Sequence, residues 1–533
     1  MKLILLLVFL SSCSSFMTKE DQQVLRNAHR TGQYDKALEY LKNSDNYQRD
    51  ESKLLLFLET GLIEHSKGNY QKSIADFEKA REVYKTLYTS SFSKNVQSLI
   101  ANDNYDHFFG ATYERSLIHF FLALNHFLLH QDANLSKSEK RIELFAARAE
   151  ILSWDSFLSE QIGEKKGRSV FKNDLLARVF GGFVHESVGT REDLEVALQL
   201  YKDAGEILFK NYNAYQVYNG LYKKFVKDFD KLHGFKTEQV RNNYVNETSF
   251  QKELKEFLNY KVLELSKKKN KRAYKKLVRS LKPSKEILKK LKEKDNITII
   301  LQRGIIPEKV AKVEYFPLGT IMASQRYQQQ GLYNFASRDL RIGYAPYHYR
   351  SYGNNYSFGS ALAIKFEVPV IRYRPIREKI TVNILDFNGK SLGEEKMVLI
   401  SPMGEIAEQA LAEDAPARYR RIGLRLATKY VTAIAASYAT YMGLRQRLGA
   451  GLAKAIAVGQ FAIASNMIQK SEKADIRYWA TLPNDIRLAS FYLPPGKYRL
   501  RANVKEEEKS FLLGKIEVDD SGQMKLFSYR RFY

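Results

Sequence analysis

Hydrophobic residues follow one period in the first half of the chain and another in the second. Before about residue 235, apolar side chains recur every three or four positions, as in "YERSLIHFFLALNHFLLH" (113–130). This period predicts packed amphipathic helices. From Asn296 onward, short β-branched runs such as "NITIILQ", "ALAIKFEVPVIRYR" and "KITVNILDFNGK" alternate with turn residues, which predicts short strands. The chain is therefore expected to be a multidomain α+β protein.

Two segments of the first half share one pattern of small and aromatic residues. "GQYDKALEYL" (32–41) and "GNYQKSIADFEKA" (68–80) are offset by 36 residues. The pattern resembles the tetratricopeptide repeat, a helix pair with a period near 34 residues. A looser third copy contains Ala197, Tyr201 and Ala204. Small residues let two helices approach while an aromatic ring fills the gap. We therefore expect a tetratricopeptide-like helical domain over residues 18–235, in which the second copy supplies Gly61, Gly68, Tyr70, Ser73, Phe77 and Ala80.

An antiparallel β-rich domain is expected over residues 296–533, with a sandwich-like or barrel-like core. "IRLASFYLPPGKYRLRANV" indicates two strands around a Pro-Pro-Gly turn. "SFLLGKIEVDDSGQMKLFSY" indicates a further hairpin, with its turn at Asp520-Ser521-Gly522. A helical insert of about residues 403–478 separates the two sets of strands.

The central part of this insert, residues 430–468, is rich in Ala and Gly and carries only three charges, Arg445, Arg447 and Lys454. We expect a helical hairpin that turns near residues 444–449. The scattered polar residues favour a hairpin that is buried or faces a partner. The alternative is a hairpin that enters a membrane, because small residues at spacing four also suit helix pairs in lipid.

Positive charge is concentrated between the two halves. The chain has a net charge of +25, and residues 261–294 contain 15 Lys and Arg but only 3 Glu. Apolar residues at roughly helical spacing make this part of the expected linker, residues 236–295, a basic amphipathic helix broken at Pro283. Five of its cations are candidates for contact with anionic lipid or a cell-wall polymer, although a solvated helical linker is the simpler interpretation: Lys267, Lys268, Lys269, Lys271 and Arg272.

The first residues predict export. Lys2, an apolar run over residues 3–10 and Ser11-Ser12 precede Cys13, in the order typical of a signal peptide. Residues 10–13, "LSSC", resemble the lipobox of bacterial lipoproteins. This resemblance implies a signal peptide over residues 1–12, lipidation of Cys13, a tether over residues 13–17, and an outer-membrane anchor facing the periplasm. An ordinary secretory signal is the alternative. An exported chain is not expected to bind nucleic acid.

The chemistry-bearing residues indicate binding rather than catalysis. Cys13 is the only cysteine, so a lipidated chain would have no disulfide, cysteine nucleophile or cysteine metal ligand. His119, His126 and His130 share one helix face with Arg115, but a polar stripe on a packed helix explains them better than a metal site. The sequence has no phosphate-binding loop, metalloprotease motif or serine elbow. We expect neither a cofactor nor an enzymatic activity.

Three further stretches are distributed over the two halves. The first half contains "FGATYERSLIHFFLALNHF" (109–127), with Tyr113 and Arg115, and the second half contains "QRGIIPEKV" (302–310) and "ADIRYWATLPNDI" (474–486). Together they resemble a family of bacterial tetratricopeptide-like envelope lipoproteins. The resemblance implies association with other small envelope lipoproteins, including ones linked to regulation of cell-wall synthases, but it implies no particular activity.

Two of these stretches have a direct physical interpretation. Asp475 and Arg477 are two residues apart in an extended segment, so they can pair and orient Trp479 where the domains meet. Gly304 and Pro307 predict a fixed turn that presents Glu308 and Lys309, the last being a candidate contact residue. In both cases a role in fixing the fold is favoured over ligand binding.

The function expected from these features is that of a lipid-anchored, non-catalytic envelope scaffold or adaptor. Its helical-repeat groove would bind other envelope proteins. Two alternatives stay open. One is a membrane-inserting component of an envelope or secretion assembly, and the other is a cell-wall-associated accessory protein.

Overall fold

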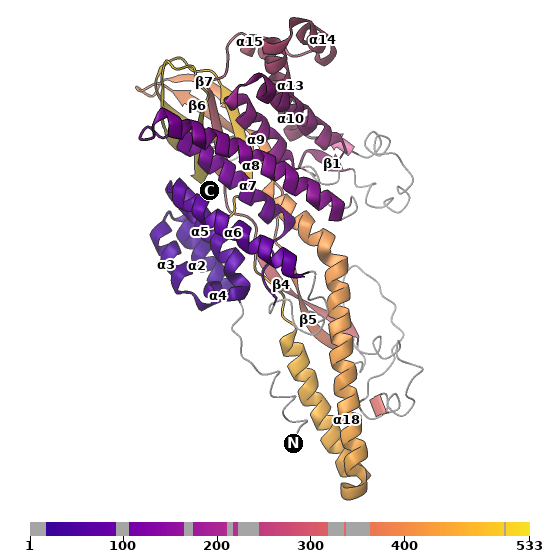
Figure 1. Cartoon of the computed structure of the whole chain (residues 1–533). Coiled ribbons are helices and arrows are strands. Elements are labelled where there is room, and N and C mark those ends of the chain that lie inside the picture. The colour runs from indigo at the N-terminus through magenta and orange to yellow at the C-terminus, as the bar shows by residue number, and fades with distance from the viewer. Residues whose placement is uncertain are drawn as a thin grey trace.

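Some helices of the first half begin at a capping side chain or end at a glycine in the left-handed conformation. Figure 1 shows the computed structural model of the chain. The structure describes residues 17–91, 106–164, 174–210, 217–221, 245–317, 335–336, 340, 363–505 and 508–532. Thr18 and Asp21 form a capping box before the first described helix. The helices are α2 (Lys19–Arg30), α3 (Tyr34–Asn43), α4 (Asp45–Gln48), α5 (Lys53–Lys67), α6 (Tyr70–Ser91), α7 (Thr112–His130), α8 (Lys137–Glu164), α9 (Leu175–Val188) and α10 (Arg191–Lys210). Cys13 and the expected signal peptide lie outside the described residues.

Successive helices of this layer pack against one another. From α5 to α10 each helix contacts the next along the chain, and α7 is buried over most of its length. The ring of Phe77 in α6 covers Gly61 in α5, and the ring of Tyr201 in α10 covers Gly182 in α9. A Cβ atom on these glycines would lie 2.9 Å and 2.8 Å from the respective rings. The glycine–aromatic contact that the repeat pattern predicts for Gly61 and Phe77 is therefore present, and α9–α10 repeats it.

The strands of the second half form two four-stranded sheets that face each other across a shared core. One sheet has the order β11-β10-β6-β7 and the other β12-β3-β9-β8. Apolar side chains of β3, β6, β10 and β11 meet between them, which is the arrangement of a sandwich. The strands are β3 (Ile297–Arg303), β6 (Ile380–Leu385), β7 (Ser391–Lys396), β8 (Val398–Ser401), β9 (Asp485–Phe491), β10 (Gly496–Val504), β11 (Lys509–Val518) and β12 (Lys525–Arg531).

The prediction of a purely antiparallel domain is wrong for the last strand, because β12 pairs with β3 in parallel. The hairpin predicted around Asp520-Ser521-Gly522 is also wrong. A turn is present there, with Gly522 at φ 60, but β11 and β12 belong to different sheets. The reason is where their apolar side chains are buried: those of β11 lie between the sheets, whereas Leu526 of β12 joins the core shared with the helices.

A long helical pair projects from the body (Figure 1). Helix α18 (Met403–Ser471) contains a turn at Gly449, whose φ of 78 and ψ of 157 are non-helical. This confirms the predicted hairpin and its turn near residues 444–449. The base of α18 packs against β5 (Ala363–Ile371), which pairs with β4 (Lys309–Pro317). A separate buried cluster joins Phe366 of β5 to Tyr430 and Phe461 of the two arms.

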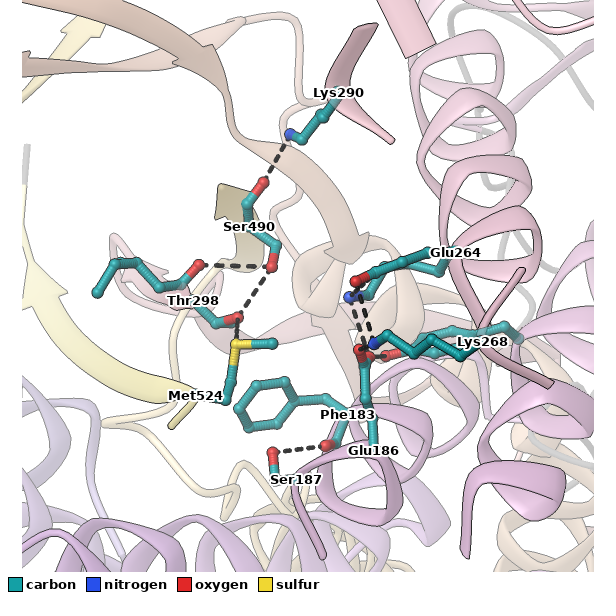
Figure 2. Close-up of polar contacts among 12 residues, drawn as sticks. Phe183, Glu186, Ser187, Glu264, Lys268, Lys290, Thr298, Ser490 and Met524 are labelled. Atoms are coloured by element: carbon teal, nitrogen blue, oxygen red, sulfur yellow. Dashed lines mark hydrogen bonds and ion pairs between the residues drawn. The ribbon is translucent and has the colours of Figure 1, made fainter. Parts of the chain in front are cut away.

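The basic segment before β3 is not a linker throughout. Helix α13 (Ser249–Lys269) follows a short ladder of β1 (Asn219–Leu221) and β2 (Val245–Glu247). It buries Leu254, Leu258 and Val262 in the same cluster as the helices of the first half. Figure 2 shows Lys268 of this helix beside Glu186 and Glu264. Because its apolar face is inside, α13 belongs to the core.

The remaining basic residues form the amphipathic helix broken at Pro283 that the sequence predicts. Helix α14 (Lys271–Leu281) and helix α15 (Lys285–Lys290) are separated at Pro283. Leu277 and Leu281 pack on Tyr260 and Leu263 of α13, while the cations of α14 point to solvent.

One buried cluster connects the two halves. It contains side chains of α2 to α10 and α13, together with residues of β3, β8, the start of α18 and the segment before β9. The candidate functional site lies at this junction.

Candidate functional site

The segment that leads from α18 to β9, residues 472–484, crosses between the two halves, and we call it the crossing segment. It is neither helix nor strand over most of its length, so its backbone groups need other partners. Side chains of the first half supply them. Gln22 donates to the carbonyl of Ile476 (2.7 Å), and Arg26 donates to the carbonyl of Ala480 (3.1 Å). The crossing segment is therefore held by residues more than 400 positions earlier.

Asp475 and Arg477 form the pair that the sequence predicts. The Arg477 guanidinium donates to both carboxylate oxygens of Asp475, at 2.9 and 2.8 Å. It also donates to the backbone carbonyls of Glu51 (3.2 Å) and Asp106 (2.9 Å). Burial alone would raise the pKa of Asp475, but Arg477 and Lys309 outweigh burial and lower it. The ionised form of the Asp475 carboxylate is therefore favoured, and Arg477 ties the crossing segment to the first half.

Trp479 is fully buried where the halves meet, as predicted. Its indole ring lies 5.7 Å from the rings of both Phe77 and Phe121. Its backbone N–H donates to the Glu114 carboxylate at 2.7 Å. Phe77 and Trp479 were singled out in two separate stretches of the sequence, and in the structure they belong to one aromatic cluster.

The turn after β3 also has the predicted form. Gly304 has a left-handed φ of 64, and its N–H donates to the carbonyl of Arg531 at 2.8 Å. Pro307 follows and contacts the start of α18 at Gly404. Lys309 points inward rather than to solvent, because its Nζ donates to the carbonyl of Arg477 at 2.9 Å. The turn thereby places a lysine against the crossing segment.

A cavity of about 690 Å³ opens beside these residues. Its walls come from the loop before α7, from β4 and β5, from the base of α18 and from the crossing segment. Four of the residues singled out from the sequence line it: Tyr113, Lys309, Asp475 and Arg477. Alanine and isoleucine side chains of α18 provide apolar surface there, notably Ala407, Ala410 and Ile422.

Charged groups of both signs line this cavity. Three arginines of α18, Arg418, Arg421 and Arg425, occur at spacings of three and four, so they share one helix face. Arg425 is buried and pairs with Glu472 at 3.4 Å. Arg421 is exposed and has no ion-pair partner among the residues that the structure describes. Carboxylates on the wall are mostly engaged, for example Glu472 with Arg425 and with Lys429.

Burial changes the proton affinities of two groups in the wall. Burial raises the pKa of Glu114, although hydrogen bonds from the backbone of Trp479 and Ala111 act against this. Burial also lowers the pKa of Lys309, while the charges of Asp475 and Glu114 oppose the shift. The arginines of α18 and the apolar side chains beside them line the same cavity. This combination suits a ligand that carries a carboxylate beside an apolar group.

The other candidates of the first half have structural contacts away from the cavity. Gly68, at φ 90, ends α5, and the ring of Tyr70 lies 5.8 Å from that of His65. The Arg115 guanidinium lies over the ring of Tyr84, 4.8 Å from its centroid. These contacts agree with a role in fixing the fold.

The three histidines of α7 face α8. His119 contacts the carboxylate of Glu150 at 3.2 Å, and His126 contacts that of Glu143 at 2.6 Å. His130 contacts the carbonyl of Lys140, also at 2.6 Å. They form the polar stripe on a packed helix that we expect, and no metal-binding group of three or more His, Cys, Asp or Glu occurs in the described part of the chain.

The five candidate cations of the basic segment do not form one free surface. Lys267 donates to the carbonyl of Leu291 at 2.6 Å, Lys268 contacts two glutamates, and Lys269 pairs with Glu195 at 2.5 Å. Lys271 and Arg272 are exposed at the start of α14. Only these two of the five are fully directed to solvent.

Sequence reasoning missed Glu59, Glu114 and the arginine row of α18. The arginine spacing was a usable signal, because residues 418, 421 and 425 follow the helical period. Glu59 and Glu114 interrupt strongly apolar helices, and such carboxylates need partners inside the protein.

No protein-family model matches the chain, and no curated protein or solved structure is detectably similar to it.

Proposed function

We propose that this chain is a lipid-anchored, non-catalytic adaptor of a bacterial envelope, and that it holds a segment of a second envelope protein in the charged cavity. The sequence "LSSC" at residues 10–13 supports the lipid anchor. The helical layer, with its two glycine–aromatic pairs, supports a tetratricopeptide-like scaffold. The cavity supports the site of binding.

The observation that carries this proposal is the convergence of separate stretches on one cavity. Tyr113, Lys309, Asp475 and Arg477 come from three parts of the chain and line the same cavity. The arginines of α18 line the cavity together with apolar groups of the same helix, so the chemistry fits a peptide segment with an acidic and an apolar side chain. Hydrogen bonds from the first half hold the crossing segment in place, and a preformed wall reduces the entropic cost of binding.

A site-specific crosslink in living cells tests the proposal. A photoreactive amino acid at Arg421 should capture one defined protein, and filling the cavity by Ala410→Trp should abolish the product. The matched control is the same photoreactive group at Arg420, which is exposed on the same helix and does not line the cavity. Equal products from both positions, or none from Arg421, would contradict the proposal.

The charge of the partner segment can be tested on the captured pair. Arg421→Glu should weaken binding more than Arg421→Gln, because it places a carboxylate opposite the expected acidic group. Arg420→Glu should have little effect. If Arg421→Glu binds as well as the unchanged protein, the acidic partner segment is wrong even where the crosslink is found.

A further inference from the structure

The turn region of the α18 hairpin exposes apolar side chains far from the body of the protein. Helix α18 contains Gly449 at its turn, and Figure 1 places this turn at one end of the molecule, with α14 and α15 at the other. Met442, Leu448, Leu452 and Ile456 are all exposed around the turn. We call residues 442–456 the hairpin tip.

The arms pack on each other through a narrow face, which leaves the tip uncovered. Tyr430 and Phe461 contact across the hairpin, and Ala453 and Ala457 face inward. Leu452 and Ile456 are one helical turn apart, so they form part of an outward stripe. Of the described helices, only α18 is long and apolar enough to cross a membrane. Of the 18 consecutive residues that make up its most apolar stretch, 22% are buried in the protein.

The hairpin also has an unusual charge distribution. From residue 415 to residue 471 the sequence contains no Asp or Glu. Arg445, Arg447 and Lys454 surround the turn and are exposed. The same stretch contains nine cations: Arg418, Arg420, Arg421, Arg425, Lys429, Arg445, Arg447, Lys454 and Lys470. A surface that combines exposed apolar groups with cations, and has no anions among them, complements an anionic bilayer surface.

We propose that the hairpin tip inserts into the headgroup region of an anionic lipid bilayer. The cations contact lipid phosphates, while Leu448, Leu452 and Ile456 enter the upper acyl layer. This contact is independent of the cavity and of the lipid on Cys13. It gives the adaptor a second attachment to membrane, which fixes its orientation as well as its location.

The lengths of the charge-free stretches favour shallow insertion over a complete crossing. Residues 430–444 lie between Lys429 and Arg445, and residues 455–469 lie between Lys454 and Lys470. Fifteen helical residues extend about 22 Å, whereas the hydrocarbon core is about 30 Å thick. A tip at the bilayer centre would bring three cations there, which is unfavourable.

A second copy of the chain fits this surface less well than lipid does. The tip of another hairpin would carry the same three cations and no carboxylate to pair with them. Like charges across such a contact oppose association. The hairpin tip is therefore complementary to phosphate rather than to itself.

Vesicle binding by the full chain tests this inference. Cys13→Ala removes both the lipid anchor and the only cysteine, so the remaining attachment can be measured by itself. We expect this protein to cosediment with phosphatidylcholine vesicles that contain phosphatidylglycerol, and to bind pure phosphatidylcholine about tenfold less. Arg445→Gln with Arg447→Gln should lose the preference for phosphatidylglycerol, as should high salt.

Leucine variants at two sites distinguish the tip from the base. Leu452 is 55% exposed at the tip and Leu424 is 53% exposed near the base of α18. Leu452→Asp should reduce binding by about tenfold, whereas Leu424→Asp should bind as before. Both variants replace exposed leucines, so neither is expected to unfold the protein. Unchanged binding of Leu452→Asp, or an equal loss in Leu424→Asp, would overturn the inference.

Probes along the hairpin report its depth. A fluorophore on Ala450→Cys, added to the Cys13→Ala chain, should shift to the blue with vesicles and be quenched by shallow lipid quenchers. Ile463→Asp should bind better than Leu452→Asp, because Ile463 lies further from the turn. Deep quenching with an equal loss at Ile463 would indicate a spanning hairpin and contradict shallow insertion. Self-association without vesicles that Leu452→Asp abolishes would indicate a second copy instead.

Discussion

The carboxylate of Glu59 accepts the backbone N–H of Ala480 at 2.6 Å, which joins residues 421 positions apart inside the core. The same carboxylate accepts the hydroxyl of Thr481. Glu59 lies in α5 and Ala480 in the crossing segment, so this contact connects the two halves directly. Burial raises the pKa of Glu59 to about 8, although the two hydrogen bonds act to lower it.

The raised pKa of Glu59 predicts a stability that falls as the pH increases. An acid with a higher pKa in the folded state binds a proton more tightly there, so between its ordinary pKa of 4.5 and about 8 folding takes up a proton. Glu59→Gln removes this linkage. Between pH 5 and pH 8 the variant should gain about 3.5 kcal/mol in unfolding free energy relative to the unchanged protein, measured by urea denaturation.

The control for Glu59 is Glu39→Gln, which removes an exposed carboxylate from α3. It measures what the loss of a surface charge does over the same pH range. A constant difference between Glu59→Gln and the unchanged protein from pH 5 to pH 8 would show that Glu59 is ionised throughout.

The glycine–aromatic contact predicts an effect of a single methyl group. Gly61→Ala would place a Cβ 2.9 Å from the ring of Phe77, and that ring cannot move freely because it stacks on Phe121. We expect a loss of about 1–3 kcal/mol in unfolding free energy. Gly205→Ala in α10 is the matched control, since its Cβ would meet nothing within 4 Å. It should gain up to about 1 kcal/mol from helix propensity, and an equal loss in both variants would contradict the packing argument.

Much of the local structure could be predicted because it depends on short-range rules. Gly68 ends α5 and Gly449 turns the hairpin, as their positions in the sequence indicate. The spacing of Asp475 and Arg477 was enough to predict their ion pair, because residues two apart in an extended segment point the same way. These features need no knowledge of distant partners.

The cavity and the pairing of the last strand, β12, could not be predicted, because both depend on contacts between distant parts of the chain. The alternation of side chains in β12 is the same whether the strand pairs in parallel or antiparallel, so its direction relative to β3 is not encoded locally. Arg421 and Tyr113 line one cavity although 308 positions separate them. No periodicity in either segment indicates that they meet.

The ion pair of Asp475 and Arg477 predicts a strong dependence on guanidinium geometry. Arg477→Met removes the partner of the partly buried Asp475 carboxylate and leaves the carbonyls of Glu51 and Asp106 without their donor. The expected loss is about 3–5 kcal/mol in unfolding free energy. Arg477→Lys should recover little, since an ammonium cannot bind Asp475 at two oxygens and both carbonyls together.

A double variant separates this pair from its surroundings. Asp475→Asn with Arg477→Met should cost less than the sum of the two single losses, because the second change removes no further ion pair. Strictly additive losses in urea denaturation would show that the two side chains act independently.

The lysines of α13 differ in the structure although they look alike in the sequence. Lys261 is buried and contacts Glu186 at 2.9 Å and Glu264 at 3.0 Å. Burial opposes its charge, but these two carboxylates outweigh burial and raise the pKa of Lys261. Lys268 contacts the same two glutamates from a half-exposed position (Figure 2).

Lys261→Met should lose about 3–5 kcal/mol in unfolding free energy, because two buried carboxylates lose their main partner, whereas Lys268→Met should lose at most about 1 kcal/mol. Thermal and urea denaturation of the two variants at one pH provide the comparison, with Lys271→Met as a fully exposed control. Equal losses for Lys261 and Lys268 would mean that the network is hydrated rather than part of the core.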